Sequence, residues 1–289
     1  MNSLAADRGL GVRFALPWRR RSGVMRGVDE FNRMATARSL ARALDEDELV
    51  VHYLPKAELP GGKVRSAEAL LRWQHPKRGL LAPAEFIAQA EQSGVIGPLT
   101  LAVIDKALGQ AASWRHLGME IGVDVNVGAR NLQLGFPEEV RTLTEKWKMD
   151  PRVLGLELSE GGLAAGDADA TTVLAELANT GVRLSIDDFG TSASSLDRLR
   201  HMPLREIKID RSFIAGVSRD ESDRTLVRSI VDMTHSFGFK IVAEGVEDQE
   251  VWDTVSQLGC DFAQGYFLTR PLPAEEFVEW MRSRAAAAA

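Results

Sequence analysis

Short apolar runs that suit β-strands alternate with helix-periodic segments over most of this 289-residue chain. The runs are rich in β-branched residues, as expected of strands buried on both faces of a sheet. We predict strands at 49–54, 63–73, 122–127, 154–159, 183–189, 206–210, 240–246 and 263–268. We predict helices at 83–94, 97–117, 137–148, 168–180, 222–237, 248–258 and 274–284. Glycines that favour helix C-termini follow several of these helices, at positions 94, 118, 181, 238 and 259.

Strands that alternate with helices indicate a parallel α/β sheet. About eight strands in roughly 240 residues, with no glycine-rich dinucleotide turn, favour a closed barrel over an open doubly wound sheet. A hydrophobic content of 45 % with 26 % charged residues agrees with a globular protein that has a sizeable core.

Net charge, cysteine content and hydropathy bear on the binding partners of the protein and on its cellular compartment. The net charge of −6 argues against a polymeric nucleic-acid binder, which would be basic. Cys260 is the only cysteine, so no internal disulfide forms and a reducing compartment is expected. With no apolar run long enough to span a membrane and no secretion signal, we expect a cytoplasmic protein.

Both ends of the chain differ from the middle. Residues 1–40 are arginine-rich, and we expect a partly disordered or helical segment there. A solvated tail is the simplest interpretation, and weak contact with an anionic membrane or a protein is the alternative. We expect one folded domain over 41–284, followed by an alanine tail at 285–289.

Nearly every predicted strand carries a polar residue near its carboxyl end. These residues are Asn126, Glu157, Asp187, Asp188, Lys208, Asp210 and Glu244, and a further one, Gln264, lies at the start of the last strand run. One such acid would usually be a turn residue or a helix cap. In a barrel, however, the strand ends meet at one mouth, where active sites lie. Their coincidence across six strands therefore predicts a functional site.

The chemistry of this set is several carboxylates, a carboxamide and a lysine. The five histidines form no zinc-binding motif, whereas oxygen ligands suit Mg²⁺ or Mn²⁺. Adjacent Asp187 and Asp188 at a strand end fit a two-metal site that activates water against a phosphoryl group. Lys208 is either a proton acceptor or charge stabiliser there, or a plain salt bridge to Asp210 or a nearby glutamate. Asp124 shares the inward face of Asn126, and we interpret it as a paired core acid rather than an added outer carboxylate.

Several long motifs resemble those of the EAL-domain cyclic di-GMP phosphodiesterases. "AEALLRWQHPKRGLLAPAEFIAQAEQSGVI" (67–96) contains the naming triplet Glu68-Ala69-Leu70. The others follow in the family's order: "VNVGARNL" (125–132), "LELSE" (156–160), "IDDFGTSASSL" (186–196), "IKIDRSFI" (207–214), "VAEGVED" (242–248) and "AQGYFLTRPLP" (263–273). The resemblance covers residues 40 to 282.

The resemblance implies a modified TIM (β/α)8 barrel with one antiparallel strand, and hydrolysis of cyclic di-GMP to linear pGpG. It assigns one Mg²⁺ or Mn²⁺ to Glu68, Asn126, Glu157 and Asp187, and a second to Asp187, Asp188 and Glu244. It implies catalytic roles for Glu68, Lys208, Glu244 and Glu160, with Lys208 assisting deprotonation of the attacking water. It implies substrate contact or support by Arg72, Leu71, Gln264 and Glu247. A homodimer is compatible with the family.

Two departures from the family pattern leave alternatives open. Leu54 stands where the family has glutamine, and Ser192-Ala193 stands where it has Gly-Tyr. Neither removes a predicted metal ligand, so we expect a working enzyme. The alternative is a weak or inactive EAL domain that acts as a cyclic di-GMP receptor or a protein-interaction module.

Overall fold

The computed structural model describes residues 38–160, 168–191 and 199–287. Most of the arginine-rich segment, the Ser192-Ala193 departure and the last two alanines lie outside the described residues. A helix at 38–45 opens the described part, and its Leu40 and Ala43 are fully buried against the rest of the core. This helix therefore includes residues on both sides of the predicted boundary at residue 41.

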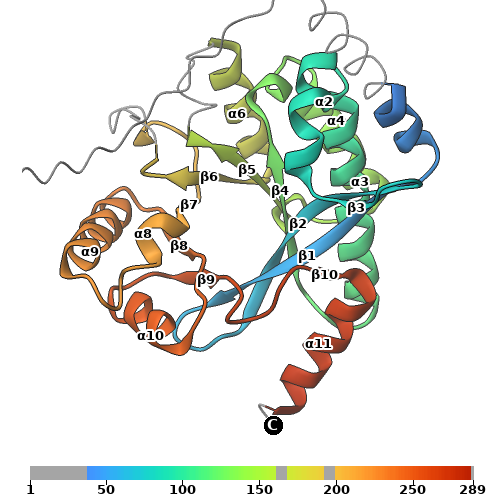
Figure 1. The fold of residues 1–289 in the computed structure, drawn as a ribbon. Coiled ribbons are helices and arrows are strands. Elements are labelled where there is room, and N and C mark those ends of the chain that lie inside the picture. Colours follow the sequence, from blue (N-terminus) through green and yellow to red (C-terminus); the bar gives the residue numbers. More distant parts are fainter. Residues whose placement is uncertain (1–37, 161–167, 192–198, 288–289) are drawn as a thin grey trace, which may run out of the picture.

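Eight of the described strands close into a barrel (Figure 1). In chain order they are β1 (Leu49–Glu58), β2 (Val64–His75), β4 (Gly122–Val127), β5 (Leu154–Ser159), β6 (Arg183–Phe189), β7 (Glu206–Ile209), β8 (Lys240–Glu244) and β9 (Phe262–Gln264). They neighbour one another in the order β1-β9-β8-β7-β6-β5-β4-β2, and β2 pairs again with β1. Two short strands extend the rim: β3 (Gly79–Leu81) pairs with β2, and β10 (Leu272–Pro273) pairs with β1.

Strand β1 is antiparallel to both of its barrel neighbours, β2 and β9, whereas the pairs from β2 through β9 are parallel. The hairpin from β1 to β2 explains this direction, because a short connection joins only antiparallel strands. The fold is a modified TIM barrel with one antiparallel strand, as predicted.

Helices cover the outside of the barrel (Figure 1). They are α2 (Ile87–Ser93), α3 (Ile96–His116), α4 (Phe136–Lys146), α6 (Ala168–Thr180), α8 (Arg211–Ile214), α9 (Glu221–Ser236), α10 (Gln249–Gln257) and α11 (Ala274–Ala287). Short 3-10 helices lie at Pro83–Glu85, Ala129–Asn131 and Pro151–Val153. Most boundaries agree closely with prediction, and all five glycines expected at helix ends have positive φ. No helix in the described ranges is long and apolar enough to cross a membrane.

Three predicted elements were wrong in extent. The strand expected at 49–54 continues to Glu58. The single helix expected at 83–94 is broken at Phe86, whose backbone is not helical and whose ring is buried edge-on against Trp73. The strand expected at 263–268 ends at Gln264, because Gly265 adopts φ 156° at a place where an added Cβ would meet the backbone of Val246. The turn at Gly265 leaves Gln264 as the last strand residue, at the rim of the barrel.

Candidate functional site

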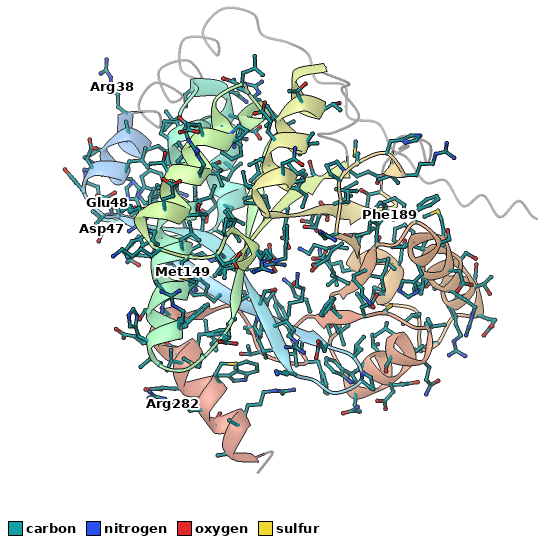
Figure 2. The ribbon with its side chains drawn as sticks, turned by 180° about the vertical axis from the view of Figure 1, so that it is seen from behind. Arg38, Asp47, Glu48, Met149, Phe189 and Arg282 are labelled. Carbon is teal, nitrogen blue, oxygen red and sulfur yellow. The ribbon has the colours of Figure 1, made fainter. Side chains whose placement is uncertain are left out.

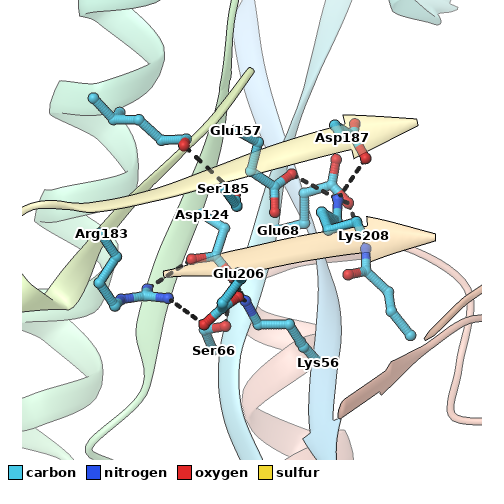
Figure 3. A network of polar contacts seen from close by, with 12 residues as sticks. Lys56, Ser66, Glu68, Asp124, Glu157, Arg183, Ser185, Asp187, Glu206 and Lys208 are labelled. Atoms are coloured by element: carbon cyan, nitrogen blue, oxygen red, sulfur yellow. Dashed lines mark hydrogen bonds and ion pairs between the residues drawn. The ribbon is translucent and has the colours of Figure 1, made fainter. Parts of the chain in front are cut away.

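The carboxyl ends of the parallel strands bring the predicted polar residues to one mouth of the barrel. We call this set the acidic cup: Glu68 on β2, Asn126 on β4, Glu157 on β5, Asp187 and Asp188 on β6, Lys208 on β7, Glu244 on β8 and Gln264 on β9. Figure 3 shows Glu68, Glu157 and Asp187 pointing toward Lys208 from three separate strands.

Lys208 lies at the centre of the acidic cup and is fully buried. Its Nζ lies 2.7 Å from Glu244 Oε1 and 2.8 Å from Glu157 Oε2. It also lies 3.2 Å from Asp187 Oδ1 and 3.5 Å from Glu68 Oε2. The predicted alternative was a salt bridge to Asp210 or a nearby glutamate. The ion pairs with glutamates are confirmed, whereas Asp210 instead caps α8 by accepting from the backbone N–H of Ser212.

The two adjacent aspartates reach the same site because the strand ends irregularly between them. Asp188 has φ 56°, a left-handed conformation that is uncommon for a residue other than glycine. The pairing of β6 with β7 shifts register between Ile186 and Phe189, across these aspartates. Regular alternation would send the two side chains to opposite faces. Instead, carboxylate oxygens of Asp187, Asp188 and Glu244 lie within 4.8 Å of one another.

Two side-chain amides hold Glu68 in place. Asn126 Nδ2 donates to Glu68 Oε1 at 2.6 Å, and Gln264 Nε2 donates to Glu68 Oε2. Each carboxylate oxygen of Glu68 is therefore oriented by one amide, Oε1 by Asn126 on β4 and Oε2 by Gln264 on β9.

Glu160, which follows β5, supports the turn after the paired aspartates. Its Oε2 accepts from the backbone N–H of Gly190 at 3.0 Å, and the side chain is buried. Gly190 has φ 98°, and an added Cβ would meet the ring of Phe213 at 2.7 Å. Glycine is therefore required where Glu160 holds this turn.

The predicted substrate contacts lie at different depths. Arg72 is half-buried on the same face of β2 as Glu68, whereas Leu71 is buried on the opposite face of the strand. Glu247 is exposed beyond the end of β8. Tyr266 was not predicted: it is exposed, carries Arg270 over its ring at 4.5 Å, and raises the pKa of Arg72 against the lowering effect of burial. Its only sequence signal is its place two residues after Gln264.

Asp124 is the paired core acid that the sequence predicts. It is buried, and its carboxylate lies 2.8 Å from Lys56 Nζ and 2.6 Å from Arg183 Nη2. Ser66 Oγ also donates to it. The residues that surround Asp124 were not predicted.

Burial and mutual repulsion perturb the carboxyl groups of the acidic cup. Burial raises the pKa of Glu157 well above its ordinary value, although Lys208 opposes the shift. Burial likewise raises the pKa of Glu244 to about 8, with Lys208 lowering it and Asp187 and Glu68 raising it. Burial alone would lower the pKa of Lys208, but its carboxylate neighbours raise that pKa well above the usual value.

The acidic cup fits divalent cations. When all five carboxyl groups are ionised, they leave four negative charges beyond the one that the ammonium balances, and two divalent cations would balance these four. Oε1 of Glu157 and Oε1 of Gln264 are buried, and neither has a hydrogen-bond partner among the described residues. An all-oxygen donor set of this kind suits Mg²⁺ or Mn²⁺.

These pKa directions predict how the stability of the metal-free protein depends on pH. A carboxyl whose pKa is higher in the folded than in the unfolded state stabilises the fold at low pH, and that contribution is lost as pH rises through the folded value. For Glu244 the loss falls between its ordinary value of 4.5 and about 8. We expect the urea midpoint of chelator-treated protein to fall from pH 5.5 to pH 8.5, and to fall less in Glu244→Gln. A midpoint that rises over this range would contradict the assignment.

A small apolar cavity adjoins the acidic cup. Its volume is about 340 Å³, and it is lined by Leu70, Ile87, Val125, Asn126 and Glu157 among others. Its wall joins apolar side chains from α2 and β4 to two residues of the acidic cup. The cavity therefore shares Asn126 and Glu157 with the acidic cup.

Comparison with known proteins identifies relatives of this chain. A family model described as the EAL domain matches residues 37–271. The bifunctional diguanylate cyclase/cyclic di-GMP phosphodiesterase MucR of Pseudomonas aeruginosa is 40 % identical over 242 residues, which is 83 % of this chain and 35 % of MucR. The cyclic di-GMP phosphodiesterase PdeR of Escherichia coli is 36 % identical over 246 residues, 84 % of this chain and 37 % of PdeR. The chain thus spans about a third of the length of these curated relatives.

Solved structures give the same match. A structure titled PaMucR phosphodiesterase in complex with c-di-GMP superposes with a TM-score of 0.79 at 39 % identity, covering 84 % of this chain and 99 % of that one. The EAL domain of DcpA from Mycobacterium smegmatis superposes with a TM-score of 0.70 at 32 % identity, covering 81 % and 98 % of the two chains.

Proposed function

Because this chain belongs to the EAL domain family, we propose that it hydrolyses one phosphodiester bond of cyclic di-GMP to give linear pGpG. The observation that carries the proposal is the acidic cup, in which five carboxylates from four strands surround one buried lysine. Relatives named as cyclic di-GMP phosphodiesterases, and a related structure in complex with c-di-GMP, support the choice of substrate.

The residues present fit a two-metal site. Glu68, Asn126, Glu157 and Asp187 would hold one Mg²⁺ or Mn²⁺, and Asp187, Asp188 and Glu244 would hold the second. Such cations polarise a phosphoryl group and lower the pKa of water, and they reverse the sign of an acidic site so that it accepts an anion.

The chain's own residues then orient the reactants. Arg72 lies on the inward face of β2 above Glu68 and would contact a phosphate of the substrate. Gln264 fixes Glu68, and Glu160 fixes the turn that follows the paired aspartates. Lys208 would stabilise developing negative charge and assist removal of the water proton.

Leu54 favours an alternative function within the same family, that of a cyclic di-GMP receptor. It lies opposite Glu68 in the β1–β2 pairing and is largely buried, so an apolar side chain lies where the family has an amide. An amide there would offer a further hydrogen bond to the acidic cup. The alternative function is therefore a receptor that binds cyclic di-GMP but turns it over weakly.

The test is to incubate the purified chain with cyclic di-GMP and Mn²⁺ or Mg²⁺ and to separate the products. We expect pGpG from the wild type and none from Glu68→Ala, because Glu68 would be a metal ligand, which two amides orient in the acidic cup. Saturable binding of cyclic di-GMP with no pGpG from either protein would establish the receptor instead. No binding and no product would contradict both functions.

A further inference from the structure

A second group of polar and charged side chains lies beneath the acidic cup (Figure 3). We call it the lower ion layer: Lys56 on β1, Ser66 on β2, Asp124 on β4, Arg183 on β6 and Glu206 on β7. Side chains alternate along a strand, so a residue two positions before a member of the acidic cup points inward one layer deeper. Ser66 precedes Glu68 in this way, Asp124 precedes Asn126, and Glu206 precedes Lys208.

In the lower ion layer each of the two cations contacts both carboxylates, and the layer carries no net charge. Lys56 Nζ lies 2.8 Å from Asp124 Oδ2 and also donates to Glu206 Oε2. Arg183 Nη2 lies 2.6 Å from Asp124 Oδ1, and Arg183 Nη1 lies 3.5 Å from Glu206 Oε1. Two cations therefore face two carboxylates. Asp124 is the member that contacts both cations at short range, with a further hydrogen bond from Ser66.

Two glycines leave the space that Asp124 and Arg183 occupy. A Cβ on Gly155 would lie 2.2 Å from Asp124 Oδ1 and 3.2 Å from Arg183 Nη2. A Cβ on Gly122 would lie 3.0 Å from the same Arg183 nitrogen and 2.9 Å from the backbone oxygen of Val153. The ion pair therefore depends on the absence of side chains at two strand positions beside it.

The two layers lie within electrostatic range of each other. Asp124 lies two residues before Asn126 on β4, which is about 7 Å along the strand. Its negative charge adds to the raised pKa of Glu157, after burial and with Glu68, while Lys208 opposes the rise. In return, Glu157 is among the groups that raise the pKa of Lys56 and of Arg183. A change of charge in the lower ion layer would therefore be felt at Glu157.

We propose that Asp124 is a positioning residue for the acidic cup, whose charge cancels Lys56 and Arg183 beneath Glu157 and thereby sets the affinity of the cup for divalent cations. The inference rests on the proposed function, because that function uses the acidic cup as a metal site. Removing the charge of Asp124 leaves two cations against one carboxylate, which disfavours a cation above them. Removing the charge of Lys56 leaves one cation against two carboxylates, which favours a divalent cation bound in the acidic cup above them.

The experiment is calorimetric titration of the chelator-treated full chain with MnCl2, which measures cation binding without turnover. We expect Asp124→Asn to weaken Mn²⁺ binding about tenfold and Lys56→Met to tighten it about threefold, given one unit of charge at this range. The double variant restores neutrality, so its Kd returns to within about threefold of wild type. Far-UV circular dichroism confirms that each variant is folded.

Two further variants keep the test decisive if Asp124→Asn does not fold. Arg183→Met removes the more solvent-accessible cation and is expected to tighten Mn²⁺ binding, as Lys56→Met does. Ser66→Ala removes a hydrogen bond to Asp124 without changing charge, and its Kd stays near that of wild type.

A purely structural role predicts that both single-charge variants weaken Mn²⁺ binding and that the double variant is weaker still. That pattern overturns the proposal, as does an unchanged Kd in every variant. A wild type that binds no Mn²⁺ overturns the metal site of the proposed function as well, so the two failures are distinguishable.

Discussion

We expect Asp187→Asn to lose cyclic di-GMP hydrolysis by about a thousandfold or more, together with the stabilisation of the fold by Mn²⁺. Asp187 lies 3.2 Å from Lys208 and within 4.8 Å of carboxylate oxygens of Asp188 and Glu244. It is therefore the acid that joins the two predicted metal positions. Asparagine keeps its shape but removes its charge, which both cations would need.

The measurement is the thermal unfolding midpoint with and without Mn²⁺, next to the hydrolysis rate. A ligand at a hundred times its Kd stabilises a protein by about 2.7 kcal/mol, so the wild type shows a rise in midpoint. Asp150→Asn is the matched control, because Asp150 caps a 3-10 helix at the opposite end of the barrel. It keeps the Mn²⁺ response. A full Mn²⁺ response in Asp187→Asn would contradict its assigned place.

Much of the fold is readable from local patterns. Strands at 122–127, 154–159 and 183–189 have the predicted boundaries, because each is a short apolar run with polar or turn-forming residues on either side. The break at Phe86 and the end of β9 at Gln264 are not readable in this way. The break depends on the contact of Phe86 with Trp73, and the strand end depends on the close approach of Gly265 to the backbone of Val246. Neither partner is a neighbour in the sequence.

The candidate site likewise contains residues that local sequence patterns predict and residues that they do not. Most residues of the acidic cup are visible in the sequence because they lie near the ends of predicted strands, whereas Glu68 lies within β2 and was assigned only through the family resemblance. Lys56 and Glu206 of the lower ion layer give no such signal, because each is a single charge inside a strand and they are 150 residues apart. Only Asp124 could be anticipated, through its shared face with Asn126. The left-handed backbone at Asp188, which brings both aspartates to one site, also has no local signal beyond the following glycine.

We expect Lys208→Met to reduce hydrolysis by about a hundredfold to ten-thousandfold while leaving Mn²⁺ binding intact or tighter. Lys208 is the single cation among the carboxylates of the acidic cup, so its removal lessens repulsion toward a divalent ion. Its raised pKa keeps it an ammonium in the metal-free protein, where it acts as a charge stabiliser. It accepts a proton only once the charge of the carboxylates around it is neutralised, because their attraction is what raises its pKa.

This outcome separates Lys208 from Asp187, since one variant loses turnover with metal binding retained and the other loses both. The measurements are the hydrolysis rate and the calorimetric Kd for Mn²⁺ in the same preparation. Lys240→Met is the matched control, because Lys240 is an exposed lysine at the start of β8 that pairs with Asp261 on the surface. It keeps the wild-type rate. If Lys208→Met also keeps that rate, Lys208 is a structural ion-pair partner that takes no part in the reaction. If Lys208→Met loses Mn²⁺ binding while it stays folded, the ammonium is needed to hold the carboxylates in place rather than to act on the substrate.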